Sequence, residues 1–364
     1  MRLAVAGGGT GGHIYPAVSV IEALGKTDPA LQVMWLGVAG GPEESIANDQ
    51  GWAFAPVSAA RVRGTGLRAP LGVYTSIFGS LGAAQHLRRF SAQVLLATGG
   101  YVSVPSIVGA KLVGVPVLLF LPDVQPGWAV RFSRWLANVV ATTSEVARRW
   151  LGGSRVIVTG YPVREAFFAM PREQARRKLE LNGRPALLVL GGSLGARSLN
   201  QATLKWVPSF LPAMQVIHVA GRRDYPWVKE EARRYGLDRA NGYRLFEYLE
   251  SLPEAMIAVD LVLSRAGASV LGELPAAGKP AVLVPYPYAG AHQRDNARYL
   301  EEKGAAVVLE NDDLDSQLGP MVERLLSDPV ALVKMAEQAR GLARPHAAED
   351  LARSLVELAE GTRA

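Results

Sequence analysis

The chain has 364 residues, 49% of them hydrophobic, with a net charge of +6 and no cysteine. This length suits two α/β domains better than one. Without cysteine, disulfides and thiolate metal sites are excluded. The mild positive charge suits anionic partners such as nucleotides, pyrophosphates or acidic lipid surfaces. Because no basic cluster is interleaved with aromatic residues, we expect no nucleic-acid partner.

The beginning of the chain has the pattern of a strand. Residues 1–6 run straight into glycines, unlike the apolar segment of an export signal. The stretch between Arg89 and Lys111 is uncharged, but two glycines and Pro105 interrupt it, so a membrane-spanning helix is not expected. We therefore expect a cytosolic or peripheral protein.

Short apolar runs alternate with amphipathic runs through the first half of the chain. Runs rich in Val and Leu are typical of buried parallel strands, and intervening helices complete βαβ units. Strands are predicted at residues 3–6, 33–38, 94–97, 117–120, 139–142 and 156–158, and a helix at 16–24. The pattern predicts a parallel, doubly wound sheet.

A glycine-rich turn, Gly7–His13, follows the first predicted strand. Glycines let the backbone turn sharply and approach a ligand, and a helix N-terminus offers N–H groups to an anion. The turn loosely matches the dinucleotide-binding pattern. However, residues 33–40 contain no Asp or Glu to hold a ribose, which argues against a nicotinamide-binding protein. The alternative is a turn without a ligand; His13 favours a site, because it would face the edge where parallel strands end.

Residues 61–81 have an unusual pattern for a soluble surface. Three arginines between positions 61 and 68 precede apolar residues at helical spacing, namely Val73, Tyr74, Ile77, Phe78 and Leu81. One interpretation is a core-facing helix after a basic loop. The other is a peripheral contact with an anionic membrane surface, in which apolar side chains enter the interface and arginines meet headgroups.

The segment Thr98–Tyr101 is a second glycine-containing turn between a predicted strand and a helix, and Ser103 and Ser106 follow it. It suits either a second phosphate or sugar loop or a plain βα turn.

The second half begins after Gly160–Arg164, where a charged helix is predicted over Arg172–Leu181. Strands follow at residues 187–190, 216–219, 261–263 and 282–284, and an amphipathic helix at 350–358 ends the series. We expect an α/β protein of two Rossmann-like domains facing a cleft, at residues 1–163 and 164–342. The terminal segment 343–364 would return to the first domain.

The turn Gly191–Ser198 opens the second half as the first glycine-rich turn opens the first half. Ser193 and the following amides could receive a phosphate at a helix N-terminus. The alternative is again a turn with no ligand.

The segment Ser264–Glu273 leads from a strand into a helix whose first turn contains only small residues. Such a turn lets a pyrophosphate lie at the helix N-terminus. Glu273 could accept hydrogen bonds from two ribose hydroxyls at once. A glutamate on a helix is usually solvated, but apolar neighbours here favour a functional role.

The segment Tyr286–Ala297 follows the last predicted strand. Its His292, Gln293 and Asn296 can bind sugar hydroxyls through neutral hydrogen bonds. The acidic residues 312–315 are interpreted as a solvated turn and not as a metal site.

In this order, the motifs resemble the MurG family, the UDP-GlcNAc:lipid I transferases of the GT-B fold. The matching segments are G-G-T-G-G-H, T-G-G-Y, G-Y-P-V-R, G-G-S-L-G-A-R, R-A-G-A-S with its following Glu, and H-Q-R-D-N-A. The resemblance covers nearly the whole chain. It implies a UDP-GlcNAc-dependent hexosyltransferase of peptidoglycan synthesis, and hence of cell-wall biogenesis, cell shape and division, with no cofactor and no metal.

The resemblance also implies residue roles. Contacts to the donor or acceptor diphosphate would come from Thr10, Gly11 and Gly12, and His13 would lie near the reaction centre. Donor phosphates would be held by Arg164 and Ser193 and lined by Ala268, Ser269, Val270, Leu271 and Gly272. Uracil would meet the backbone of Leu249, ribose would bind Glu273, and the GlcNAc hydroxyls would bind His292 and Gln293. One segment departs from the family, since residues 121–127 lack the usual Glu, so that Asp123 would take the remaining polar role there.

The implied reaction is an inverting transfer of GlcNAc to the 4-hydroxyl of MurNAc-pentapeptide on undecaprenyl pyrophosphate, the conversion of lipid I to lipid II. His13 is the expected general base, with Asp123 as the alternative. The implied location is the cytoplasmic face of the cell membrane, as a peripheral protein. Three other functions remain open: a different glycolipid-directed UDP-sugar transferase, a GT-B-type UDP-GlcNAc epimerase, and a non-catalytic sugar-nucleotide sensor.

Overall fold

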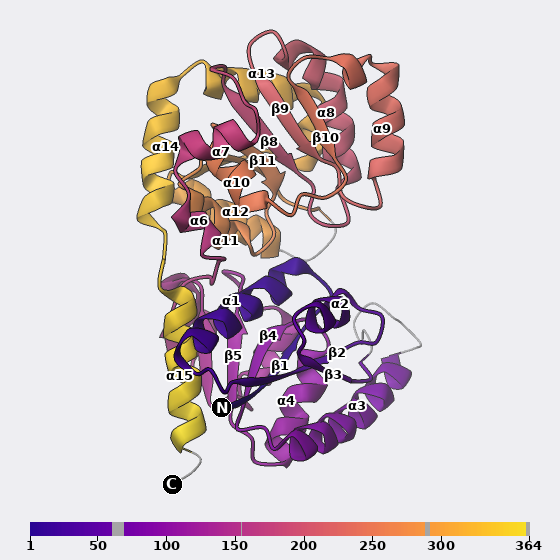
Figure 1. The fold of residues 1–364 in the computed structure, drawn as a ribbon, viewed down its shortest axis with the longest axis vertical. Helices are drawn as coiled ribbons and strands as arrows, with labels where there is room; N and C mark the ends of the chain where they lie inside the picture. Colours follow the sequence, from indigo (N-terminus) through magenta and orange to yellow (C-terminus); the bar gives the residue numbers. More distant parts are fainter. Residues whose placement is uncertain (60–68, 154, 288–291, 362–364) are drawn as a thin grey trace. The chain divides into compact units, whose positions relative to one another are not determined.

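The computed structural model describes residues 1–59, 69–153, 155–287 and 292–361 (Figure 1). The chain forms two compact units. Unit 1 contains Met1–Val163 together with Arg344–Ala364, and unit 2 contains Arg164–Ala343.

Unit 1 is an α/β unit whose strands alternate with helices. Its elements are β1 (Arg2–Gly7), α1 (Gly11–Thr27), β2 (Gln32–Gly37), α2 (Pro42–Asp49), β3 (Ala53–Pro56), α3 (Ala69–Phe90), β4 (Val94–Gly99), α4 (Ser103–Leu112), β5 (Val117–Leu121), α5 (Trp128–Ser133), β6 (Val139–Thr142), η2 (Glu145–Trp150), β7 (Val156–Val158) and α15 (Ala347–Gly361).

The sheet of unit 1 has seven parallel strands in the order β3-β2-β1-β4-β5-β6-β7. The strand order reverses between β1 and β4, which pair directly. Helix α15, from the end of the chain, lies beside α1, and α3 lies beside α4 (Figure 1). The central strand β4 is buried along its whole length, as expected for a sheet covered on both faces.

Unit 2 repeats this architecture. Its elements are α6 (Ala166–Ala169), α7 (Arg172–Lys178), β8 (Ala186–Leu190), α8 (Arg197–Phe210), β9 (Gln215–Val219), α9 (Tyr225–Arg234), η3 (Leu237–Arg239), β10 (Tyr243–Phe246), α10 (Leu252–Ala258), β11 (Leu261–Arg265), α11 (Val270–Ala277), β12 (Ala281–Val284), α12 (His292–Glu302), β13 (Ala306–Val308), η4 (Asn311–Asp313), α13 (Leu314–Leu326) and α14 (Pro329–Gly341).

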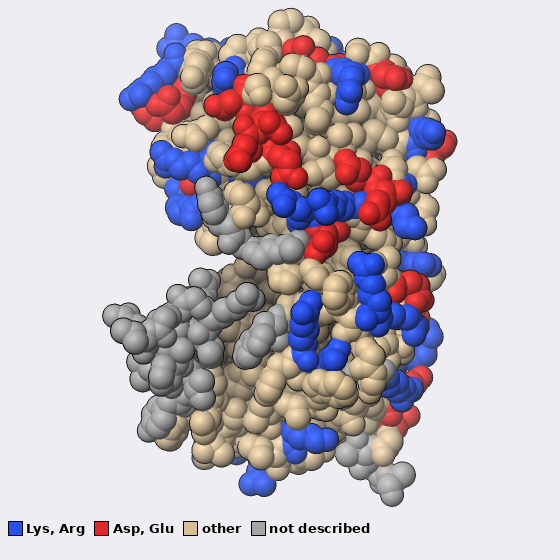
Figure 2. Space-filling view, turned by 180° about the vertical axis from the view of Figure 1, so that it is seen from behind, with Lys and Arg blue, Asp and Glu red and all other residues tan. Residues whose placement is uncertain are grey.

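The sheet of unit 2 has six parallel strands in the order β10-β9-β8-β11-β12-β13, with the reversal between β8 and β11. Helix α8 packs beside α9 and α13, while α10 packs beside α7 and α11. Acidic and basic side chains lie interspersed over unit 2, in the upper half of the face drawn in Figure 2. The predicted α/β fold, with two parallel doubly wound sheets, is confirmed.

The described parts of the chain contain no helix that combines the length and apolar character needed to cross a bilayer. The predicted solvated turn at residues 312–315 is a short 3-10 turn, Asn311–Asp313, that leads into α13.

Candidate functional site

The glycine-rich turns lie where the two sheets change strand order. In unit 1, Gly7–His13 follows β1 and Thr98–Tyr101 follows β4, the two strands at the reversal. In unit 2, Gly191–Ser198 follows β8 and Ser264–Glu273 follows β11, again the strands at the reversal. Open α/β sheets bind ligands outside the carboxyl ends of strands at such switch points. Each unit therefore presents one candidate site.

His13 lies in the first turn of α1 and is joined to the turn after β4. Its Nδ1 is 2.9 Å from the carbonyl oxygen of Thr98, and the Thr98 hydroxyl donates to the His13 carbonyl at 2.6 Å. A carbonyl can only accept, so Nδ1 must carry the proton. In neutral His13 the lone pair is then on Nε2, which is the state required of a general base. The half-buried ring leaves part of the side chain accessible.

The N-terminus of α1 is open toward an anion. Thr10 occupies the cap position without a side-chain cap, and no acidic residue lies in the first turn. The backbone N–H groups of Gly11 and Gly12 therefore form part of the positive end of the helix dipole, and no carboxylate of their own turn competes for them.

Glu43, in the first turn of α2, binds the backbone of the glycine-rich turn Gly7–His13. Its carboxylate accepts from the backbone N–H of Gly9 at 3.1 Å and of Val38 at 3.0 Å, and the side chain is only 1% exposed. A Cβ at Gly8 would lie 2.4 Å from this carboxylate, so the approach requires glycine. Because the carboxylate is already occupied and buried, it is not offered to a ribose. The role of Glu43 was not predicted from sequence, because this residue lies three positions after the acid-free segment 33–40.

Removing the Glu43 carboxylate should destabilise unit 1. In Glu43→Ala the N–H groups of Gly9 and Val38 lose their acceptor inside the protein, which we expect to cost about 2–4 kcal/mol. Thermal unfolding followed by circular dichroism would measure the loss. Glu43→Gln, which keeps one acceptor oxygen, should lose about half as much. An alanine variant that unfolds at the wild-type temperature would show that these bonds contribute nothing.

Tyr161 ties the Gly160–Arg164 segment to α1. Pro16 lies inside α1 and has no N–H to donate to the carbonyl four residues earlier. That carbonyl, of Gly12, instead accepts from the Tyr161 hydroxyl at 3.0 Å. Helix α1 therefore begins at Gly11, five residues before the predicted start at Pro16.

Asp123 lies in the segment that follows β5, near the carboxyl end of that strand, and is half-buried. The Thr143 hydroxyl donates to the carbonyl of Pro122 at 2.9 Å and so holds the segment in place. Asp123 thus shares the carboxyl edge of the unit 1 sheet with His13.

The unit 2 turn after β8 presents its central residues outward. Ser193 is exposed, and Leu194 is 59% exposed. Helix α8 begins directly after the turn, with no side-chain cap and no acidic residue in its first turn. This is the arrangement that favours an anion at a helix N-terminus.

Glu273 lies in the first turn of α11 and is half-buried. Burial raises the pKa of its carboxyl group, while a hydrogen bond from Ser269 and the positive charge of Arg164 oppose that rise. The guanidinium of Arg164 also donates to the carbonyl of Glu250 at 3.4 Å. Arg164 and Glu273 therefore belong to one electrostatic environment within unit 2.

Arg265, at the end of β11, joins α8, β12 and η4, and its role was not predicted from sequence. Its guanidinium donates to the Ser198 hydroxyl at 2.7 Å, to Asn311 Oδ1 at 3.0 Å and to the Val284 carbonyl at 3.2 Å. Burial lowers the pKa of this guanidinium. An arginine in R-A-G-A-S could have been found as a charge at the end of a buried strand.

The other residues predicted to bind the sugar donor lie on α12 and in the loop between β10 and α10. Gln293 Oε1 accepts from the backbone of Tyr286 at 3.0 Å, and His292 Nδ1 is buried with no hydrogen-bond partner among the described residues. Asn296 is fully buried and donates to the Ala266 carbonyl at 3.1 Å, so it holds the loop after β11. Leu249 lies half-buried in the loop between β10 and α10. Their ligand contacts stay predictions.

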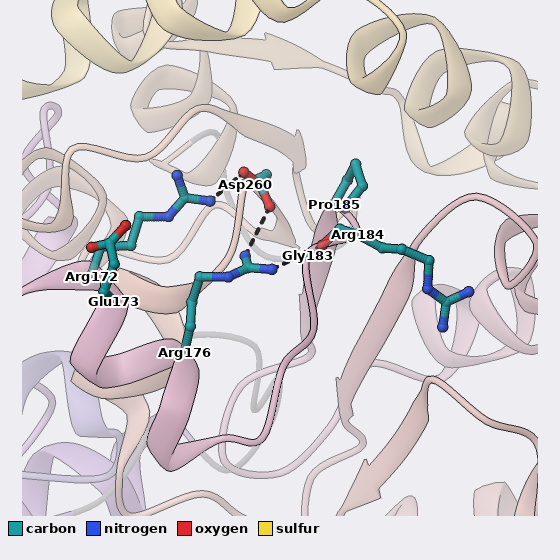
Figure 3. Close-up of a pocket in the computed structure, with 7 residues that line it drawn as sticks. All are labelled: Arg172, Glu173, Arg176, Gly183, Arg184, Pro185 and Asp260. Atoms are coloured by element: carbon teal, nitrogen blue, oxygen red, sulfur yellow. Dashed lines mark hydrogen bonds and ion pairs between the residues drawn. The ribbon is translucent and has the colours of Figure 1, made fainter.

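A separate depression in unit 2 is lined by Arg172, Glu173, Arg176, Gly183, Arg184, Pro185 and Asp260 (Figure 3). Arg172 and Arg176 point toward the Asp260 carboxylate and pair with it, whereas the Arg184 side chain points away. Pro185 and Asp260 directly precede β8 and β11, so the depression lies at the amino ends of the strands. This is the edge opposite to the one where such sheets bind ligands. Asp260 instead fixes α7 to the sheet, since it also accepts from the backbone of Ala186 at 2.9 Å.

Comparison with known proteins agrees with these features. Residues 3–142 match the glycosyltransferase family 28 N-terminal domain, and residues 186–351 match the glycosyltransferase family 28 C-terminal domain. The chain is 38% identical to a UDP-N-acetylglucosamine--N-acetylmuramyl-(pentapeptide) pyrophosphoryl-undecaprenol N-acetylglucosamine transferase from Roseiflexus sp. (strain RS-1), over 97% of this chain and 94% of the relative.

Two solved structures are also similar. The crystal structure of Acinetobacter baumannii MurG has a TM-score of 0.76 and 25% identity, covering 98% of this chain and 99% of that one. A UDP-GlcNAc 2-epimerase from Neisseria meningitidis has a TM-score of 0.68, covers 98% of this chain and 100% of that one, and at 15% identity shares only the fold. With family models matching both units and a full-length relative at this identity, the chain belongs to glycosyltransferase family 28 and, within it, to the MurG family.

Proposed function

We propose that this protein transfers GlcNAc from UDP-GlcNAc to the 4-hydroxyl of MurNAc-pentapeptide on undecaprenyl pyrophosphate, converting lipid I to lipid II in peptidoglycan synthesis. The observation that carries the proposal is the pair of open helix N-termini at the switch points, in a chain of this family. Both substrates carry a diphosphate, so two anion-accepting turns match two ligands.

The donor is assigned to unit 2. Its phosphates would lie at Ser193 and at the N-terminus of α11, formed by Ala268–Gly272, with Arg164 supplying a positive charge. Glu273 would accept from the ribose hydroxyls, and the backbone of Leu249 would meet uracil. His292 and Gln293 would bind the GlcNAc hydroxyls, with Asn296 holding the loop beneath them.

The acceptor and the base are assigned to unit 1. The acceptor 4-hydroxyl attacks the anomeric carbon, a bond forms between them, and the bond from that carbon to the UDP oxygen breaks, with inversion. The hydroxyl proton passes to Nε2 of His13, whose tautomer is fixed by the Thr98 carbonyl. Asp123 is the second candidate for this proton. Helix N-termini stabilise the negative charge that develops on the leaving UDP.

A panel of donors and acceptors distinguishes this function from its alternatives. UDP release should be fastest with UDP-GlcNAc and a short-chain lipid I analogue, and slow when the donor is UDP-glucose or the acceptor is a diacylglycerol. Without acceptor, UDP-GlcNAc should remain unchanged by proton NMR; formation of its C2 epimer would identify an epimerase. Binding of UDP-GlcNAc with no turnover on any acceptor would indicate a sugar-nucleotide sensor.

A peripheral contact with the cytoplasmic face of an anionic membrane would bring the enzyme to its lipid-linked acceptor. Helix α3 exposes Ile77, Phe78 and Leu81 by 55%, 52% and 56%, and Arg88 and Arg89 lie in its last turn. These exposed side chains favour the membrane interpretation over a core-facing helix, since apolar side chains beside arginines are typical of interfacial helices. The arginines between positions 61 and 68 lie outside the described residues.

Replacing both Ile77 and Phe78 with Ser should reduce binding to phosphatidylglycerol-containing vesicles by roughly tenfold, because two apolar side chains no longer enter the interface. Turnover of a long-chain acceptor in those vesicles should fall in parallel, while turnover of a water-soluble short-chain acceptor should persist. Vesicle co-sedimentation and the two assays measure this. The matched control replaces Val330 and Val333, two exposed valines on α14 of unit 2, with Ser. Equal loss on both acceptors would contradict the membrane role.

A further inference from the structure

A chain of buried polar side chains lies beneath the turn that follows β8. It consists of Tyr243 at the start of β10, His218 in β9, Asn200 in α8 and Asp224 just before α9. His218 and Asn200 are fully buried, and Asp224 is 2% exposed. His218 Nδ1 lies 2.9 Å from the Tyr243 hydroxyl, and His218 Nε2 lies 2.9 Å from Asn200 Oδ1.

The hydrogen bonds among these four side chains each have a defined donor and acceptor. Asn200 Nδ2 lies 3.0 Å from the Ala220 carbonyl and 3.1 Å from Asp224 Oδ2, two acceptors that fix the orientation of the amide. Asn200 Oδ1 is therefore an acceptor, so His218 Nε2 carries the proton and Nδ1 accepts from Tyr243. Burial lowers the pKa of His218 to about 3, which agrees with this neutral form. Each of these polar groups is thus satisfied in a single arrangement.

The two acceptors of the Asn200 amide, the Ala220 carbonyl and Asp224 Oδ2, lie against the turn Gly191–Ala196. Gly195 adopts a φ of +98°, and a Cβ there would lie 2.6 Å from the Ala220 carbonyl oxygen and 2.7 Å from Asp224 Oδ2. The turn also rests on the following loop, because the N–H of Arg222 donates to the Ser193 carbonyl at 3.1 Å. Any shift of Asn200 or Asp224 therefore moves the backbone beside Ser193.

The four side chains cost free energy to bury, and an apolar set would fill the same space without that cost. A fully satisfied buried network has one defined geometry, whereas apolar packing tolerates several. Asp224 also places a carboxylate next to an anion-accepting turn, where an uncompensated charge would repel a phosphate. Its Oδ2 accepts from Asn200 and its Oδ1 from Arg223 at 3.3 Å, so both oxygens are occupied.

We propose that Tyr243, His218, Asn200 and Asp224 form a positioning network that holds the Gly191–Ala196 turn in the geometry that receives the donor diphosphate. The inference rests on the proposed function, because that function assigns the donor to this turn. None of the four residues is catalytic; they act through the backbone of the turn. Their loss should weaken donor binding and leave the rate with saturating donor nearly unchanged.

The decisive variants are Asn200→Asp and the double variant Asn200→Asp/Asp224→Asn. The single change sets two carboxylates against each other at about the present 3.1 Å separation, while the double change restores one carboxylate and one amide at that contact. We expect the single variant to raise the donor KM and the UDP Kd by roughly tenfold or more, with kcat within about threefold. The double variant should recover part of the affinity, because it restores the contact with residue 224 but leaves the Ala220 carbonyl without its donor. Tyr243→Phe, which removes only a hydroxyl, should weaken UDP binding by roughly threefold to tenfold.

The matched control is Thr203→Val, which removes a buried hydroxyl one turn further along α8 that donates to the Leu199 carbonyl of the same helix. It should change stability without changing UDP affinity. Amide hydrogen exchange of residues 192–196 in the free protein gives a second readout, which should accelerate in Asn200→Asp and Tyr243→Phe but not in the control. Unchanged exchange and unchanged UDP affinity in both variants, or a double variant no better than the single one, would overturn the positioning role. If the wild-type protein binds no UDP while the two variants still exchange faster than it does, the proposed donor assignment is refuted and the positioning of the turn stands.

Discussion

His13→Ala is expected to lower kcat by roughly 10²- to 10⁴-fold and to leave the affinity for UDP-GlcNAc within about twofold. The Nδ1 proton of His13 is committed to the Thr98 carbonyl, so Nε2 is the nitrogen that can take the acceptor proton. Donor binding should hardly change, since the donor is assigned to unit 2. Steady-state rates with saturating donor, together with calorimetric binding of UDP-GlcNAc, separate the two effects.

His13→Gln is the matched control for this prediction. Its side-chain amide can still donate to Thr98, but it cannot accept a proton at neutral pH. Loss of the same size in both variants identifies proton transfer as the missing function. If either variant keeps most of its rate between about pH 6 and 9, His13 only supports the turn, and Asp123 becomes the candidate base.

Glu273→Ala is expected to weaken UDP-GlcNAc binding by roughly tenfold to a hundredfold, because a hydrogen bond to a charged group is worth about 1.5–3 kcal/mol. Isothermal titration calorimetry measures this directly. Since burial raises the pKa of Glu273, the wild-type affinity should also decline as the pH falls through that raised pKa and the carboxylate gains a proton. An unchanged donor affinity in the variant would remove Glu273 from the site.

The same carboxylate should reduce the stability of the folded protein at neutral pH. A glutamate whose pKa is raised on folding holds more protons in the native than in the unfolded state, so its contribution to stability is lost as the pH rises through the raised pKa. Glu273→Gln should therefore raise the melting temperature at neutral pH while weakening donor binding. Glu302→Gln, at an exposed position on α12, is the control and should change neither.

Sequence patterns predicted the central strands but missed three at or near the sheet edges. β4 is buried throughout and consists largely of apolar residues, so its pattern is unambiguous. β3, β10 and β13 were not predicted: each has only three or four residues and is partly exposed, β3 ends in Pro56, and β10 contains Arg244. Edge strands receive their hydrogen bonds from a neighbour that a local pattern does not reveal.

The parts of the candidate site that were predicted are those marked by residues adjacent in sequence. Glycines next to a strand end indicate a turn, which is why the four turns at the switch points were found. The supports of those turns come from distant segments. Tyr161 gives the Gly12 carbonyl the hydrogen bond that Pro16 cannot make, although Tyr161 and Gly12 are 149 positions apart in the chain. Glu43 and Arg265 likewise act on loops that only the folded sheet brings near them.

The most direct test of the central claim is the product formed from radiolabelled UDP-GlcNAc and a short-chain lipid I analogue. The proposed function predicts one lipid-linked disaccharide, with one UDP released for each GlcNAc transferred and a β-linkage to the MurNAc 4-hydroxyl by NMR. Label that remains in UDP-GlcNAc or its epimer, or that appears only on a lipid without MurNAc, would contradict it.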